Sequence, residues 1–354
     1  MNEARAGIAS GLRWQAGWCA RLGSPLYGDL LEHVACEVEQ GGPARDLLDL
    51  PGSGRRDVDG VLPGGQALRL MGAVHRLVLE GRAPELARYY PSVGGSPDAG
   101  GAREALSALL AAQPEAVMTL MEQPVQTNEV GRSAALLGGF LAVAEQTGLP
   151  LRLLEFGASA GLNLRWDRYF YAGPADSWGD PASPVRFTDA FGESSPPLQA
   201  QPQISERRGC DPSPLDPAVE ADALTLTSYV WPDQERRLGV LRAALDLAPS
   251  VAVTIDRAPA LEWVEEVLAE PRPGSATVVF HSIVLPYLGE TGVTRLTAAL
   301  EQAGSRADRQ APLAWLRMEA GGDQADVTLV TWPDRRERVI AKASYHGPPV
   351  TWLG

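Results

Sequence analysis

The sequence predicts an α/β protein in which an all-helical region, residues 1–148, precedes a mostly parallel sheet formed by residues 149–354. Two observations lead to this prediction. Apolar residues recur at helical spacing through the first region, whereas short apolar runs alternate with helical patterns in the second. Strands that alternate with helices are joined by crossovers, and crossover connections produce parallel pairing.

The first region contains helical patterns separated by loops. Ser24 and Pro25 form a helix start, with serine as N-cap and proline in the first turn. A second helical pattern runs over 66–80 and carries His75 on its apolar face, which we interpret as a packed structural histidine. A third helix is predicted over 128–145. Stretches rich in glycine and proline predict loops at 41–54, 60–65 and 91–101.

The pattern changes at Pro150, because residues 151–156 form a short apolar run that Gly157 ends, as expected of a buried strand. Further strands are predicted at 203–208, 251–255, 277–283, 313–319, 327–332 and 338–343. Helical patterns lie between them at 233–247, 259–269 and 292–303. Only residues 333–335 separate the last two strands, so these should form an antiparallel hairpin that completes a seven-stranded sheet. Residues 166–202, rich in aromatic residues, Pro, Gly and Asp, are interpreted as an irregular insertion.

Composition limits the class of partner. The 31 basic and 44 acidic residues give a net charge of −13, which disfavours nucleic acid and favours a small-molecule substrate. No apolar run reaches the length of a membrane span and no secretion signal is recognised, so we predict a cytoplasmic protein without membrane contact. The three cysteines and four histidines have no metal-ligand spacing, so no metal site is predicted.

The chemistry-bearing motif follows the first predicted strand and reads Glu-Phe-Gly-Ala-Ser-Ala-Gly over residues 155–161. A strand that ends in glycines and turns into a helix offers free N–H groups at the helix N-terminus. Gly157 and Gly161 allow ligand atoms to approach the backbone, because they carry no Cβ. The motif therefore predicts a cofactor loop.

This motif resembles the first motif of class I S-adenosylmethionine-dependent methyltransferases, and the strand–helix layout resembles their Rossmann-like fold. The resemblance implies S-adenosylmethionine as cofactor. It assigns cofactor binding to Glu155, Gly157, Ala158, Ser159, Gly161, Asn163, Asp211 and Asp256. Asp211 would bind the ribose hydroxyls and Asp256 would lie near the adenine, although either aspartate can equally cap the turn that follows it. Ser159 replaces the middle glycine of the family motif.

Other polar residues are candidates for the substrate side of the site. His281 lies near the carboxyl end of the fourth predicted strand and is a candidate general base, with the alternative that it is buried and hydrogen-bonded. Tyr287 would line the pocket or stack on a ring of the substrate. Substrate-binding roles are predicted for Asn128, Glu129, Arg132 and Trp166. Asn128 can equally be a helix N-cap, and Trp166 can equally be a packing residue. The helical region 1–148 is predicted to form a lid or substrate domain.

Several longer segments together resemble the uncharacterised bacterial family called domain of unknown function 2332. They are VQTNEVGRSAALL, LRLLEFGASAGLNLRWDRY, RRGCDPSPLD, VWPDQERRL, VVFHSIVLPYL, PLAWLRMEA and SYHGPPVTWL. This resemblance covers essentially the whole chain and implies no established chemistry.

Two other functions remain open. Residues 157–161 also match G-x-S-x-G, the nucleophile elbow of α/β-hydrolases, and Ser159, Asp256 and His281 or His346 occur in the chain order of such a triad. Against an esterase, the nucleophile strand would be the first strand of the sheet and no HGGG-type oxyanion loop precedes it. The third alternative is a non-catalytic nucleotide-binding module.

Overall fold

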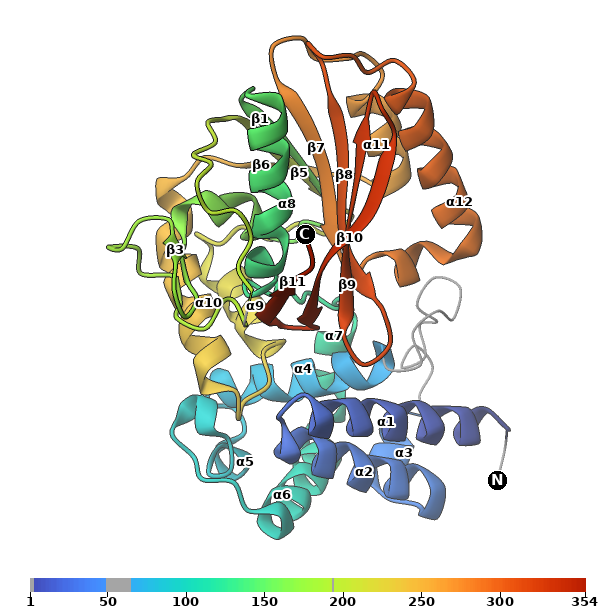
Figure 1. Ribbon diagram of the computed structural model, residues 1–354. Coiled ribbons are helices and arrows are strands. Elements are labelled where there is room, and N and C mark those ends of the chain that lie inside the picture. The colour runs from blue at the N-terminus through green and yellow to red at the C-terminus, as the bar shows by residue number, and fades with distance from the viewer. Residues whose placement is uncertain (1–2, 49–64, 193) are drawn as a thin grey trace. The chain divides into compact units, whose positions relative to one another are not determined.

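The computed structural model describes residues 3–48, 65–192 and 194–354, which form two compact units (Figure 1). One unit comprises Met1–Thr127 and Val219–Gly239, and the other comprises Asn128–Ala218 and Val240–Gly354. This division differs from the predicted boundary after residue 148, because the chain returns to the first unit once. Residues 49–64, which include the last six residues of the predicted loop 41–54 and the first five of the predicted loop 60–65, lie outside the described residues. Within the described part of 41–54, residues 43–48 are helical rather than a loop.

The described residues of the first unit are helical, as predicted, and contain no strand. Its helices are α1 (Glu3–Arg21), α2 (Pro25–Gln40), α3 (Pro43–Leu48), α4 (Gly65–Leu79), α5 (Pro84–Ala87), η2 (Pro91–Val93), α6 (Ala99–Ala112), α7 (Pro114–Met121) and α9 (Glu220–Ser228). The predicted helix start at Ser24 is confirmed, because its side chain accepts a hydrogen bond from the Tyr27 amide. His75 is fully buried between the Ser228 carbonyl and the Ser92 hydroxyl, which confirms a packed histidine.

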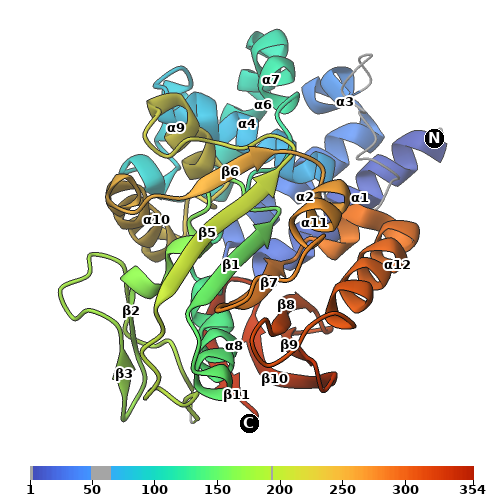
Figure 2. The same cartoon turned by 90° about the horizontal axis from the view of Figure 1, so that it is seen from above.

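The second unit contains an eight-stranded sheet in the order β11-β10-β9-β8-β7-β1-β5-β6 (Figure 2). Its strands are β1 (Leu151–Phe156), β5 (Ile204–Asp211), β6 (Thr254–Arg257), β7 (Ala276–Ser282), β8 (Leu313–Ala320), β9 (Ala325–Trp332), β10 (Arg336–Ser344) and β11 (Gly347–Trp352). The pairs from β6 to β8 are parallel, whereas β8 to β11 form an antiparallel meander. The predicted β9–β10 hairpin is confirmed. The prediction of seven strands is wrong, because β11 adds an eighth.

Helices cover both faces of this sheet, which explains why β1 and β7 are buried along their whole length. One face carries α8 (Arg132–Thr147), whose Phe140 ring packs edge-on against Phe280 of β7. The other face carries α11 (Ala260–Val267) and α12 (Leu285–Gly304), which share a core with Phe156 of β1 and Trp315 of β8. In the chain, α10 (Glu235–Leu247), whose first residues belong to the first unit, and η4 (Ala248–Ser250) precede β6.

The structure corrects the prediction that a helix follows the glycine motif. Only a six-residue 3-10 helix, η3 (Asn163–Arg168), follows β1. The chain then forms a small sheet in the order β3-β2-β4, composed of β2 (Phe170–Ala172), β3 (Ser177–Trp178) and β4 (Arg186–Phe187). Trp166 forms its core, stacked at 4.5 Å on Phe140 and at 5.3 Å on Trp178. The insertion therefore takes the place of a covering helix in this crossover.

Close packing of α8 gives a first testable prediction. A Cβ added to Gly138 would lie 2.8 Å from Cε3 of Trp352 and 2.9 Å from Cβ of Pro196, whereas Gly239 in α10 has open space around it. We expect Gly138→Ala to lower the free energy of unfolding by about 1–3 kcal/mol through overpacking. Gly239→Ala should raise it by about 0.5–1 kcal/mol, because alanine favours helix. Urea denaturation of both variants measures the difference. A stabilising Gly138→Ala would contradict the packing, and adding Trp352→Leu should relieve the overpacking.

Candidate functional site at the ends of strands β1 and β5

Strand order locates the place where a ligand would bind. The chain passes from β1 to β5 and β6 on one side, then crosses to β7 and β8 on the other. The topological switch point therefore lies between β1 and β7, and open parallel sheets bind ligands beyond the carboxyl ends of their strands at such points. Residues 157–161 form the turn at the carboxyl end of β1.

This turn, which we call the glycine turn, alternates between ordinary and left-handed backbone. Gly157 has φ of 67°, Ser159 of 52° and Gly161 of 66°. Glycine adopts this conformation without strain, whereas a serine rarely does. A Cβ on Gly157 would lie 2.7 Å from a Val284 methyl, so close packing also selects glycine there.

Most amides of the glycine turn bind groups of the protein itself. The Ser159 amide donates to Oδ2 of Asp211 at 3.0 Å, and the Ala158 amide donates to the Cys210 carbonyl at 3.0 Å. The Gly161 amide donates to the Ala158 carbonyl at 2.7 Å. The expected row of amides open to a ligand is therefore not present, and Asp211 occupies the Ser159 donor.

Asp211 is the last residue of β5 and is 8% exposed. Its two oxygens accept from two different amides, Ser159 at 3.0 Å and Ser213 at 2.8 Å. Because each carboxylate oxygen has two lone pairs, both oxygens can still accept a hydroxyl from a ligand. Asp211 thus lies at the site, as predicted, and also caps its own turn.

The predicted substrate residues before α8 contact the turn directly. Oδ1 of Asn128 accepts from the Leu162 amide at 3.1 Å, so Asn128 does not cap α8, whose N-cap is Gly131. The side-chain amide of Asn163 donates to the Glu129 carbonyl at 3.3 Å. Segment 128–131 and the glycine turn are therefore joined by reciprocal side-chain contacts.

Arg132, the first residue of α8, extends this contact to β7 and to the β10–β11 turn. Its Nη1 donates to the Ser282 carbonyl at 3.2 Å, and its Nε donates to the Tyr345 carbonyl at 3.1 Å. The structure thus brings Asn128, Glu129 and Arg132 together with the ends of β1 and β7, although these residues are far apart in sequence.

Glu155 is the most unusual group of the site. It is 2% exposed, and its Oε2 has no hydrogen-bond partner among the described residues. Burial raises the pKa of Glu155 well above its ordinary value, and the charge of Asp211 raises it further. The positive charges of Arg165 and Arg132 act in the opposite direction. Oδ1 of Asn163 is a second buried acceptor without a partner, so the site contains two unused acceptors.

No sequence motif singled out Arg165, the residue of η3 that anchors the turn. Its Nη1 donates to the Gly161 carbonyl at 2.8 Å and to the Ala160 carbonyl at 3.2 Å. Its Nε donates to the carbonyls of Ala248 and Val251, both at 3.2 Å. No local sequence pattern predicts this role, because two of the residues that Arg165 contacts, Ala248 and Val251, are more than 80 positions further along the chain.

His281 does not have the geometry of the predicted general base. Its Nδ1 bonds Oε1 of Glu319 at 2.8 Å, its Nε2 accepts from the Trp315 indole at 3.1 Å, and the residue is fully buried. Because side chains alternate along a strand, His281 faces α11 and α12 with Phe156, whereas Glu155 faces α8. The buried, hydrogen-bonded alternative therefore describes His281, and its two ring nitrogens have no capacity left for a substrate proton.

Three other predicted residues also have roles outside the turn. Trp166 is fully buried in the aromatic stack, so the packing alternative describes it and it does not line a substrate surface. Tyr287 is 41% exposed in α12. Asp256, at the carboxyl end of β6, accepts from Nε of Arg208 and from the Trp263 indole, both at 2.6 Å. Asp256 therefore lies two strands from β1, with its carboxylate oriented by these donors.

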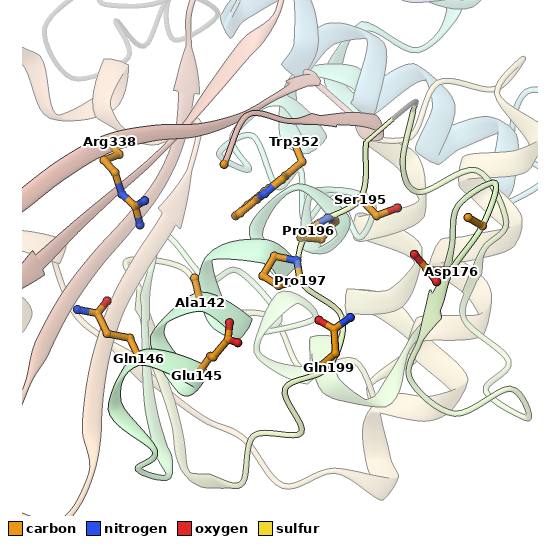
Figure 3. A pocket seen from close by; sticks show the side chains of 12 residues that line it. Ala142, Glu145, Gln146, Asp176, Ser195, Pro196, Pro197, Gln199, Arg338 and Trp352 are labelled. Atoms are coloured by element: carbon orange, nitrogen blue, oxygen red, sulfur yellow. The ribbon is translucent and has the colours of Figure 1, made fainter.

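The second unit also has a hollow of about 820 Å³ at the other end of α8 (Figure 3). It is lined by charges of both signs, Glu145, Asp176 and Arg338, together with Pro197 and Trp352. Arg132 and Glu145 are 13 residues apart on α8, or roughly 20 Å at 1.5 Å per residue. The hollow contains none of the predicted site residues, so we place the candidate site at the glycine turn.

Comparison with known proteins adds a family but no chemistry. A family described as an uncharacterised protein conserved in bacteria, domain of unknown function 2332, matches residues 9–352. No curated protein and no solved structure shows significant similarity to the chain. Among the described residues, no three histidine, cysteine, aspartate or glutamate side chains are grouped as a metal site, and no helix is long and apolar enough to cross a membrane.

The buried Glu155 gives a second testable prediction. Because its pKa is raised in the folded state, the folded chain retains a proton that the unfolded chain has released. Stability should therefore be highest below the unfolded pKa of about 4.3 and should fall as pH rises toward the folded pKa. Glu155→Gln should remove this decline, with a stability gain over wild type that grows by at most about 1.4 kcal/mol per pH unit. Urea denaturation from pH 4.5 to 8 measures the difference. A gain that does not change with pH would contradict the assignment.

Proposed function

Because the chain belongs to the bacterial family of domain of unknown function 2332, whose description names no activity, we propose a function from the site itself. The second unit binds S-adenosylmethionine at the glycine turn and transfers its methyl group to a small-molecule acceptor. The observation that carries this proposal is the pair of acidic residues, Glu155 and Asp211, buried on either side of the turn at the switch point.

The charge of this pair distinguishes between ligands of glycine-rich turns. Dinucleotides place a pyrophosphate on free amides after the first strand. Here the Ser159 amide already binds the Asp211 carboxylate, so a phosphate would meet negative charge. A ligand with positive charge and hydroxyl donors instead meets acceptors. S-Adenosylmethionine carries an ammonium, a sulfonium and two ribose hydroxyls.

The residues present fit this group. Oε2 of Glu155 and Oδ1 of Asn163 are buried acceptors without donors, which an ammonium would satisfy. Asp211 has lone pairs left for the ribose hydroxyls. Gly157 and Gly161 keep the turn free of side chains.

The strand arrangement also supports the proposal. The order β6-β5-β1-β7-β8 places the third, second, first, fourth and fifth parallel strands side by side, as in doubly wound nucleotide-binding sheets. The eighth strand and the absence of a helix after β1 are departures from the methyltransferase layout that the sequence resembles.

The protein's own contribution to the reaction would be binding, orientation and exclusion of water. When bound, S-adenosylmethionine supplies a methyl group on a positively charged sulfur. Glu155 would hold the ammonium of the cofactor and Asp211 its ribose, and holding two reactants in line contributes most of the acceleration in such a displacement. His281 has no part in this proposal, because both of its nitrogens are bonded.

One observation favours the esterase alternative. The left-handed φ of 52° at Ser159 is a strained serine conformation in a strand-end turn, as a nucleophile elbow requires. Against it, Asp256 binds Arg208 and Trp263, and His281 binds Glu319 and Trp315, so these two residues do not form the predicted triad with Ser159. We therefore interpret the strain at Ser159 as the geometry that directs its amide to Asp211.

Calorimetric titration with S-adenosylmethionine tests the proposal. We expect binding with a Kd in the micromolar range, weakened about tenfold or more by Asp211→Asn, which removes the charge opposite the turn. Binding of a cation next to protonated Glu155 should release a proton, and the release is measured by comparing two buffers with different enthalpies of ionisation. Glu155→Gln should abolish the proton release.

The matched control is Glu301→Gln, which removes an exposed carboxylate bound to Arg335 at 2.7 Å and should leave affinity and proton release unchanged. Absence of binding by the folded wild type would refute the proposal. Tighter binding of NAD than of S-adenosylmethionine would refute the charge argument.

A separate experiment tests the esterase alternative. We expect a fluorophosphonate probe to leave the wild type unlabelled, because His281 and Asp256, two of the residues proposed to activate Ser159, are bonded to other residues. Labelling is read by intact-mass spectrometry, with Ser159→Ala as the control. Labelling of the wild type that is lost in Ser159→Ala would establish the esterase reading instead.

A further inference from the structure

Arg165 is a buried cation whose side-chain hydrogen bonds all go to backbone carbonyls. It is 5% exposed, and Nε and Nη1 each donate to two carbonyls. A charged group removed from water to this extent is costly unless its donors are satisfied. Four carbonyl acceptors bind the Nε and Nη1 donors while leaving the charge without an adjacent carboxylate. Because no carboxylate of the described residues neutralises it in an ion pair, the charge of Arg165 acts on more distant groups, among them Glu155.

The four carbonyls belong to two separate segments. Ala160 and Gly161 are in the glycine turn, whereas Ala248 and Val251 lie just before β6, the strand that carries Asp256. Arg165 therefore joins the turn to the approach of β6. An α-helix after β1 would satisfy these turn carbonyls with its own amides. In this chain η3 is short, and only the Leu164 amide returns to the Gly161 carbonyl, at 3.2 Å.

The charge of Arg165 also opposes the burial of Glu155. Four charged groups act on one another here: Glu155 at the end of β1, Asp211 at the end of β5, Arg165 in η3 and Arg132 at the start of α8. Asp211 and burial raise the pKa of Glu155, and Arg165 and Arg132 lower it. Arg132 binds carbonyls at the end of β7 and in the β10–β11 turn, so Arg165 is the cation fixed to the glycine turn itself.

We propose that Arg165 is the positioning residue of the nucleoside site. It holds the carbonyl side of the glycine turn against the approach of β6, and it supplies the buried positive charge that keeps Glu155 available as an acceptor for a cationic ligand. This inference rests on the proposed function for the identity of the ligand. Its mechanical part, the anchoring of the turn, does not depend on the ligand.

The test compares Arg165→Met, which removes charge and hydrogen bonds, with Arg165→Lys, which keeps the charge but has fewer, differently directed donors. Binding of S-adenosylmethionine is titrated by calorimetry from pH 5.5 to 8.5. Because binding needs ionised Glu155, affinity should fall as pH decreases through its pKa. Arg165→Met should weaken binding about tenfold or more and move this midpoint to higher pH, whereas Arg165→Lys should weaken binding with the midpoint unchanged.

The matched controls are Arg152→Met and Arg152→Lys. Arg152 is likewise a buried arginine of the second unit, 8% exposed, and it lies near the start of β1. It donates to Glu206 at 2.8 Å and to the Val267 carbonyl at 3.3 Å. These variants lose a buried arginine without touching the glycine turn. They should lower stability while leaving the pH midpoint of binding unchanged, so a shift confined to Arg165→Met separates positioning from general destabilisation.

A ligand-free measurement separates this inference from the proposed function. Hydrogen exchange should be faster at the amides of Ser159 and Leu162 in Arg165→Met than in wild type and in Arg152→Met, because the turn loses its anchor. If the wild type binds no S-adenosylmethionine but exchange rises in Arg165→Met, the ligand is wrong and the anchor is right. Unchanged exchange, or wild-type affinity and midpoint in Arg165→Met, overturns the inference. If Arg165→Met does not fold, wild-type affinity in Arg165→Lys overturns it.

Discussion

The pair of hydrogen bonds that Asp211 accepts from the amides of Ser159 and Ser213 is the interaction on which the candidate site depends. In doubly wound proteins the turn after the first strand is closed by the helix that follows it, and the ligand binds the amides that remain. Here no α-helix follows, so side chains replace it. Asp211 holds the turn from β5, Asn128 holds it from before α8, and Arg165 holds it from η3. The turn is thus fixed before any ligand binds.

Holding the turn with the carboxylate of Asp211 places a second acidic group near Glu155. Glu155 lies beneath the same turn, buried and near Asp211, and the two negative charges oppose each other's ionisation. A stability argument alone would place an uncharged side chain at residue 155, because a buried acceptor without a donor lowers the stability of the folded state. Retention of an acid there is understandable if a ligand supplies the missing donor and charge. The buried, unpaired acceptor of Glu155 is therefore both the group that lowers the stability of the folded state and the group that could bind a ligand.

Local patterns predicted the elements of this fold well. The apolar run 151–156 became β1, the Ser24–Pro25 helix start was confirmed, and the short link 333–335 did connect an antiparallel pair. What the sequence could not predict was what covers each face. Because side chains alternate along a strand, Phe156 and Glu155 point to opposite faces of the sheet. Only the positions of α8 and α12 decide which face holds the site.

The structure brings some of the predicted site residues together at the turn, whereas it gives others different surroundings because of partners that no sequence pattern indicates. Glu155, Ser159 and Asp211 do meet at the turn. His281 was misplaced because Trp315 and Glu319, more than 30 residues further along the chain, take both of its nitrogens. β11 was missed because Pro348 and Pro349 argue against a strand in a sequence pattern, yet this strand lies at the edge of the sheet, where proline is tolerated.

A glycine-rich turn therefore specifies a shape and leaves the charge of its ligand open. In this chain the decisive information is not in Gly157 or Gly161, which only permit the left-handed backbone. It lies in what the turn's amides and neighbours are already bound to. When the protein's own carboxylate takes the amide that would hold a phosphate, the same turn disfavours anions and leaves acceptors for cations and hydroxyls. Recognition by this site is then governed by the balance between two buried acids and the arginines that face them.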